Sequence, residues 1–210
     1  MVESRIQTTL DGDAHVITPP GKTLVLEQPV YDDLRVELSS VRVPAVAGPG
    51  FSQFKDNGDS STGVFLPWFD DGTEEQVYFS AQFPHSQQLN SRVYPHIHWT
   101  PAANGGAGQK VNWGLEYTWA EPFAIFGDTT IIYANDHVPD ETLVAGKHYI
   151  SGFEEIEGHT NGVSNIMVCR LFRDAGGTGG TDDLAQDAGA LYVDFHFRAD
   201  TLGSRTEFSK

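Results

Sequence analysis

Short runs of β-branched and aromatic residues, separated by clusters of Gly, Asp, Asn and Pro, dominate the sequence from residue 51 onward. Such runs are typical of β-strands, and the clusters between them are typical of turns. No window of roughly eleven or more residues keeps the apolar spacing of a helix. Only a short helix near residues 181–188 is expected. The sequence therefore predicts an all-β chain.

Eight strands are predicted, at residues 63–69, 76–83, 94–100, 111–119, 129–134, 147–153, 164–172 and 190–198. Short strands in such number, joined by turn-rich loops, fit a sandwich or a barrel. We therefore expect a jelly-roll-like antiparallel β-sandwich over residues 46–210. A length of 210 residues suits one such domain.

The N-terminal residues 1–45 differ from the rest, because they are poor in aromatic residues and are interrupted by proline. Pro19, Pro20, Pro29 and Pro44 cannot donate a backbone hydrogen bond to a neighbouring strand. We therefore expect an extended N-terminal arm with edge-strand segments.

Two predicted strands differ in the side chains on their faces. In residues 111–119 the odd positions are Val, Trp, Leu, Tyr and Trp, while the even positions include Asn112, Glu116 and Thr118. Side chains alternate between the faces of a strand, so this strand should be buried on one face only. Residues 165–172 are apolar on both faces, as in a strand between two layers or one covered by a neighbouring subunit.

Charge and cysteine content exclude several classes of protein. The 13 basic and 29 acidic residues give a net charge of −16, which repels nucleic-acid phosphates and anionic lipids. The single cysteine, Cys169, excludes an intrachain disulfide framework, and its apolar neighbours predict a buried thiol rather than a nucleophile. We expect no apolar leader and no membrane span, which would need roughly 18 apolar residues. We therefore expect the chain to be synthesised in a cytoplasm.

The candidate site lies on two predicted strands. His96 and His98 stand two residues apart on one of them, and Asp194 and His196 repeat this spacing on another. Side chains with that spacing share a face, so pairing of the strands would bring three imidazoles and a carboxylate together. Such a set can bind Zn²⁺, Fe²⁺ or Mn²⁺, and an open coordination position would make the metal catalytic.

A hydrogen-bonded cluster is the interpretation that we favour for these residues, with the imidazoles donating to carboxylates such as Asp194 or Glu116. A structural metal and a cupin-like, metal-dependent enzyme built on His96, His98 and His196 are the alternatives. Cupins place a glutamate a few residues after the His-x-His pair, and no carboxylate follows His98 within residues 99–104. We assign no catalytic residue and no cofactor-binding residue, and expect no cofactor apart from that possible metal ion.

Three other features suggest ligands. The Gly-rich loop 174–183, with Asp187 after it, and residues 56–59 contain carboxylates that could bind Ca²⁺, although their spacing is not that of an EF-hand. The four tryptophans, Trp68, Trp99, Trp113 and Trp119, could stack on sugars if they were exposed. Trp113 and Trp119 fall on the face predicted to be buried, which favours a core role. No Ser or Cys stands in a recognisable nucleophile motif.

Several segments together resemble a family of largely uncharacterised virion structural proteins from tailed bacteriophages and prophages. The segments are residues 20–26, 32–36, 40–44, 79–86, the strand carrying His96 and His98, 113–119, 169–174 and 194–205. The similarity covers most of residues 20–210. The family has no catalytic residues that could be transferred to this sequence.

The resemblance implies a non-enzymatic protein of the virion. We expect a capsid decoration or cement protein that contacts the major capsid protein or other virion proteins and forms a homo-oligomer, such as a trimer, with no nucleic-acid or membrane partner. An adaptor at the tail, collar or fibre base, with glycan binding, is the second hypothesis. The cupin-like enzyme is the third.

Overall fold

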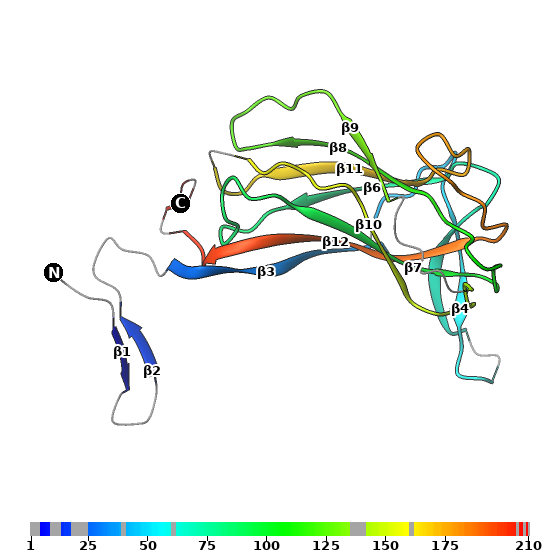
Figure 1. Ribbon diagram of the computed structural model, residues 1–210, viewed down its shortest axis with the longest axis horizontal. Coiled ribbons are helices and arrows are strands. Elements are labelled where there is room, and N and C mark those ends of the chain that lie inside the picture. The colour runs from blue at the N-terminus through cyan, green and yellow to red at the C-terminus, as the bar shows by residue number, and fades with distance from the viewer. Residues whose placement is uncertain are drawn as a thin grey trace.

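Two antiparallel β-sheets packed face to face form the body of the protein, as the computed structural model in Figure 1 shows. The structure describes residues 5–8, 14–17, 25–38, 41–59, 62–134, 142–159, 162–204, 206–207 and 209. Within these ranges every regular element is a strand. The predicted all-β sandwich is therefore confirmed, and its jelly-roll connectivity stays a prediction.

The first sheet is built around its longest strand, β12. In spatial order it contains β10 (Tyr149–Gly152), β7 (Tyr94–Pro101), β12 (Ala188–Thr201), β5 (Val64–Phe69) and β4 (Gly50–Lys55). The beginning of β12 pairs with β5, and its later residues pair with β3 (Val25–Glu37). One strand thus joins the β4–β5 pair to β3 and β7.

The second sheet contains β6 (Gln76–Gln82), β11 (Ile166–Arg173), β8 (Trp113–Ala120) and β9 (Thr130–Tyr133), in that order. A separate hairpin is formed by β1 (Arg5–Thr8) and β2 (Ala14–Ile17). In Figure 1 this hairpin stands clear of both sheets, on the side where β3 begins.

All eight predicted strands are present, with ends that differ from the prediction by at most a few residues. The expected helix at residues 181–188 is wrong, because Asp182, Asp183 and Leu184 hold this segment in an irregular loop through contacts with residues distant in sequence. The strand β4 was not predicted. No helix among the described residues is long and apolar enough to cross a membrane.

The predicted division at residue 45 differs from the observed sheet. Strand β3 lies within the range assigned to the arm, yet it pairs with β12 from Val25 to Glu37 and forms an edge of the first sheet. Pro29 is tolerated there, since none of the other described strands pairs with the outer side of β3. The sandwich therefore already includes residues 25–38, and the hairpin before them is the part that stands apart.

Aromatic and aliphatic side chains fill the space between the sheets. Trp99, Trp113 and Phe195 are fully buried there, and the ring of Phe83 stacks on that of Trp119. The odd positions of β8 face this core, which confirms the predicted phase of the strand. At Gly114 the backbone passes so close to the ring of Phe172 that a Cβ would lie 2.1 Å from it.

Strand β11 bears out only part of the expectation for residues 165–172: its outer face is exposed, so among the described residues it does not lie between two layers, and cover by a neighbouring subunit stays a prediction. Met167, Cys169 and Leu171 lie in the core, whereas Ile166 and Val168 are exposed on the opposite face of the second sheet. The buried position raises the pKa of the Cys169 thiol far above its usual value, so the thiol stays protonated and unreactive. This agrees with the predicted buried thiol.

Candidate histidine and carboxylate site

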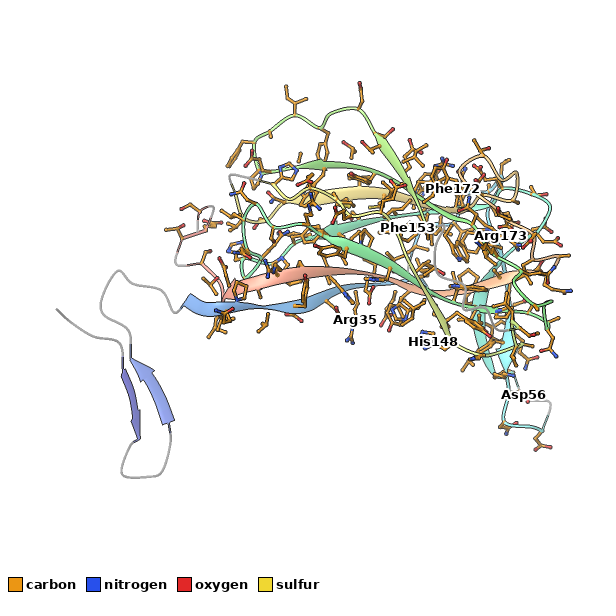
Figure 2. The ribbon with its side chains drawn as sticks, viewed as in Figure 1. Arg35, Asp56, His148, Phe153, Phe172 and Arg173 are labelled. Carbon is orange, nitrogen blue, oxygen red and sulfur yellow. The ribbon has the colours of Figure 1, made fainter. Side chains whose placement is uncertain are left out.

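The four predicted site residues lie together on the outer face of the first sheet. Strands β7 and β12 pair with Asp194 opposite His96, while Ile97 and Val193 point into the core. The predicted strand pairing and the shared face are therefore both observed. Figure 2 shows Arg35 and His148 on this outer side, away from the second sheet.

Asp194 is the centre of the group, and its side chain is only 4% exposed. Its Oδ2 accepts a hydrogen bond from His98 Nε2 at 3.1 Å and lies 3.5 Å from His196 Nε2. Its Oδ1 lies 3.5 Å from His96 Nδ1. Three imidazoles thus surround one carboxylate, as the sequence predicted.

The pKa of Asp194 reflects this setting. Burial alone would raise it, but polar contacts with His96 and His98, and the positive charge that His98 and His196 carry when protonated, lower it more strongly. The pKa therefore lies well below its usual range, and the carboxylate is ionised at neutral pH. A buried anion of this kind requires cationic partners or a bound cation.

Two further residues that sequence reasoning missed belong to the group. Asp33 on β3 lies opposite His196 in the paired strands, and its Oδ1 is 2.9 Å from His196 Nε2. His148, just before β10, contacts His98 with 2.7 Å between Nε2 and Nδ1. The alternation of side chains along an edge strand in the predicted arm could have placed Asp33 on one face of that strand. The residues around Asp33 in the sequence do not indicate that its partner is His196.

A groove borders this group. It has a volume of about 620 Å³ and is lined by Glu37, Phe54, Phe65, Leu66, Thr100, Gly146, His148, Leu191 and Tyr192. The ring of Tyr192 stacks on His98, with 4.2 Å between centroids. Burial and the neighbouring His98 lower the pKa of His148, which favours its neutral form. A ligand in the groove would therefore meet an imidazole that can accept or donate a hydrogen bond.

The group is partly the hydrogen-bonded cluster that the sequence analysis favoured. His98 is fully engaged, since its two ring nitrogens contact His148 and Asp194. His96 Nδ1 and Asp194 Oδ1, by contrast, are buried without a hydrogen-bond partner. Glu116 takes no part, because it lies on the second sheet and pairs with Arg170.

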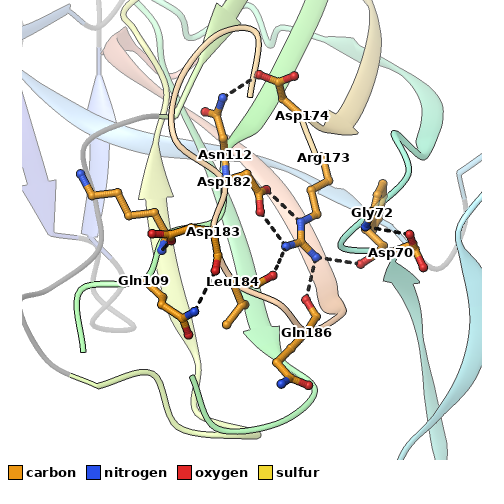
Figure 3. A network of polar contacts seen from close by, with 12 residues as sticks. Asp70, Gly72, Gln109, Asn112, Arg173, Asp174, Asp182, Asp183, Leu184 and Gln186 are labelled. Carbon is orange, nitrogen blue, oxygen red and sulfur yellow. Dashed lines mark hydrogen bonds and ion pairs between the residues drawn. The ribbon is translucent and has the colours of Figure 1, made fainter. Parts of the chain in front are cut away.

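The loop 174–183 uses its carboxylates for internal contacts (Figure 3). Asp182 forms a two-point ion pair with Arg173, with Oδ1–Nη2 at 2.7 Å and Oδ2–Nε at 2.9 Å. Asp174 Oδ2 accepts from Asn112 Nδ2 and from the Gly179 amide. These oxygens satisfy buried donors and close the loop, so the structure supports a structural role for them rather than calcium binding.

The other two ligand hypotheses find little support in the geometry. In residues 56–59, Asp56 accepts from the Gly58 amide and Asn57 accepts from the Asp59 amide, which is the arrangement of a turn. Trp99 and Trp113 are buried, so the four tryptophans form no exposed row for sugar stacking. Asp187, the carboxylate that follows the loop, lies with Asp70 and Asp71 in a group in which one oxygen from each is within 4.8 Å of the other two.

One pair of contacts joins segments too distant in sequence to be predicted. His85 contacts the Ser204 hydroxyl through Nδ1 at 2.5 Å and the Ser164 hydroxyl through Nε2 at 2.6 Å. Ser164 has a left-handed backbone, with φ of 63°. Both ring nitrogens are occupied by hydroxyl groups, so His85 ties the region after β12 to the loop before β11.

No family model matches the chain, and no curated protein shows significant similarity to it.

Proposed function

We propose that the protein is a structural component of a bacteriophage particle that decorates the capsid shell and stabilises it. The observation that carries the proposal is the isolated β1–β2 hairpin. Its two strands pair only with each other among the described strands. A two-stranded hairpin is at best marginally stable in water, so this one needs a binding surface.

An exposed apolar surface supports assembly. It comprises Ile166 and Val168 on β11 and three residues of the loop between β8 and β9, Phe123, Ile125 and Phe126. Phe123 is 92% exposed and Ile125 is 95% exposed. Phe123, Phe126 and Ile166 line one depression of about 520 Å³, which joins the loop to the strand. Contiguous apolar surfaces of this kind are typical of protein interfaces.

Charge agrees with assembly through these surfaces. The net charge of −16 keeps monomers apart in solution, so contacts should form where charge is low. The hairpin would add its strands to a neighbouring subunit or to the major capsid protein, as in other β-strand additions. The apolar surface on the second sheet would face another copy of this chain in a symmetric oligomer, for which a trimer is our expectation.

The test is to locate the chain in the native particle and count its copies by electron cryo-microscopy and quantitative mass spectrometry. Hundreds of copies on the shell, together with loss of heat and osmotic resistance when the gene is deleted, would support the proposal. A dozen or fewer copies would favour the tail, collar or fibre-base adaptor instead. Absence from purified particles would refute both.

A further inference from the structure

Four side chains that can bind metal project from three neighbouring strands on the outer face of the first sheet. His96 lies on β7, Asp194 and His196 lie on β12, and Asp33 lies on β3. Strand register sets Asp194 opposite His96 and Asp33 opposite His196. For His96, Asp194 and His196, one ligand atom from each lies within 4.8 Å of the other two.

Two of the three contacts have a spacing that suits a shared ion better than a direct hydrogen bond, while the third, His196 Nε2 to Asp33 Oδ1 at 2.9 Å, has the length of a hydrogen bond. Two of the contacts, His96 Nδ1 to Asp194 Oδ1 and His196 Nε2 to Asp194 Oδ2, are both 3.5 Å long. Hydrogen bonds between nitrogen and oxygen are usually about 2.7–3.2 Å long. Ligands bound at about 2.0–2.1 Å in a tetrahedron stand roughly 3.3–3.4 Å apart, close to the observed separation.

Two buried atoms lack partners at this place. His96 Nδ1 and Asp194 Oδ1 make no hydrogen bond, although the Asp194 side chain is 4% exposed and that of His96 is 24% exposed. A buried polar atom left without a partner costs roughly 1–3 kcal/mol, so such atoms are rare unless a water or an ion completes them. The two atoms lie 3.5 Å from each other, so one cation bound to both would satisfy them together.

We infer that His96, Asp194 and His196 bind one divalent transition-metal ion, and that Asp33, which lies outside this close group but is 2.9 Å from His196 Nε2, shifts to supply a fourth ligand. Two imidazole nitrogens with carboxylate oxygens favour Zn²⁺ and its neighbours in the first transition row over Ca²⁺ and Mg²⁺, which prefer oxygen ligands. This set differs from the sequence prediction, because Asp33 enters it and His98 leaves it. His98 binds Asp194 Oδ2 and His148 instead, and so orients the carboxylate from outside the ligand set.

The consequence concerns β3, the strand that follows the isolated hairpin. Asp33 would tie β3 to β12 and β7 through the ion, in addition to its backbone pairing with β12. Arg35 competes for Asp33, with 3.5 Å between Nη2 and Oδ2, but its side chain is 66% exposed and can move away. Metal would therefore hold the edge strand that carries the hairpin. This inference is independent of the role in the virion.

The experiment uses the untagged full-length protein, stripped with a chelator and dialysed. We expect calorimetric titration with Zn²⁺ to show one equivalent bound, and Co²⁺ to give visible bands in the tetrahedral range. A hundredfold excess of Zn²⁺ over its Kd should raise Tm by about 5–11 °C, whereas Ca²⁺ and Mg²⁺ should not. No binding of Zn²⁺ or Co²⁺, or equal binding of Ca²⁺, would overturn the assignment.

Variants locate the ion. His96→Gln and His196→Gln should each abolish stoichiometric binding while retaining the circular dichroism spectrum. Asp33→Asn should weaken binding at least tenfold. His159→Gln is the matched control, because His159 packs against the ring of Trp119 and contacts none of the site residues, and it should still bind one ion. Loss of binding in His159→Gln, or its retention in His196→Gln, would refute the site, and unchanged affinity in Asp33→Asn would refute the link to β3.

Discussion

Arg173 at the end of β11 provides the sharpest test of how the molecule is held together. Its side chain is fully buried and all five of its N–H groups have acceptors. Two bonds go to Asp182, and the others go to the carbonyl oxygens of Phe69, Leu184 and Gln186. The guanidinium therefore joins β5, β11 and the loop before β12, and Figure 3 shows its contacts with Asp182, Leu184 and Gln186.

The change to test is Arg173→Met, which keeps an unbranched apolar stem and removes the guanidinium group with its charge. Asp182, with a side chain 1% exposed, would be left as an unpaired buried anion, and three buried carbonyl groups would lose their donors. Removing one partner of a buried ion pair costs about 3–5 kcal/mol. For a protein of this size that corresponds to a decrease in Tm of roughly 6–20 °C.

The measurement is urea unfolding followed by tryptophan fluorescence, because Trp99 and Trp113 report on the core. Arg92→Met is the control, since Arg92 forms exposed ion pairs with Glu155 and Glu157, and it should leave the midpoint nearly unchanged. The double change Arg173→Met with Asp182→Leu should recover part of the loss, because no charge is then stranded. A free energy of unfolding for Arg173→Met within about 1 kcal/mol of the parent would refute this reasoning.

Three further outcomes are expected. Gly114→Ala should cost about 1–3 kcal/mol because its Cβ would collide with the Phe172 ring, whereas Gly50→Ala has open space and should be nearly neutral in the same urea titration. Cys169 should resist a thiol reagent in the native protein and react at once in denaturant; fast native labelling would contradict its burial. Asp194→Asn, measured with chelator present, should lower stability most at neutral pH. Because the folded pKa of Asp194 is depressed, its contribution exists above about pH 4 and disappears as the pH falls below that value. A difference between Asp194→Asn and the parent that does not change from pH 7 to pH 3 would contradict this sign.

Strand positions could be predicted because alternation is a property of consecutive residues. Val111, Trp113 and Leu115 are apolar at every second position, and each is buried in the folded protein. Strand β3 was harder to recognise, since Pro29 and the charged residues Asp32, Asp33 and Arg35 give it the composition of an arm. Its place at the edge of the sheet explains that composition, because no second strand among the described residues pairs with it.

The candidate site was predicted in part, because alternation along a strand also determines which side chains share a face. The spacing of His96 and His98, and of Asp194 and His196, determined that each pair shares a face. Which atoms meet was not determined, because His98 turned out to bridge Asp194 and His148 instead of standing beside His96 as a ligand. Which side chains meet within a cluster depends on the register between paired strands, and the sequence of one strand does not determine that register.

The sequence by itself determined eight of the strands, the buried thiol of Cys169 and the two apolar faces of β11, since each follows from the residues next to one another. Only the tertiary structure decided that β3 pairs with β12 and brings Asp33 to His196, and that Arg173 meets Asp182. Such pairings join distant segments, and their energy depends on burial and on the geometry of several partners at once. The pattern of neighbouring residues in the sequence determines neither the burial nor the geometry of these contacts.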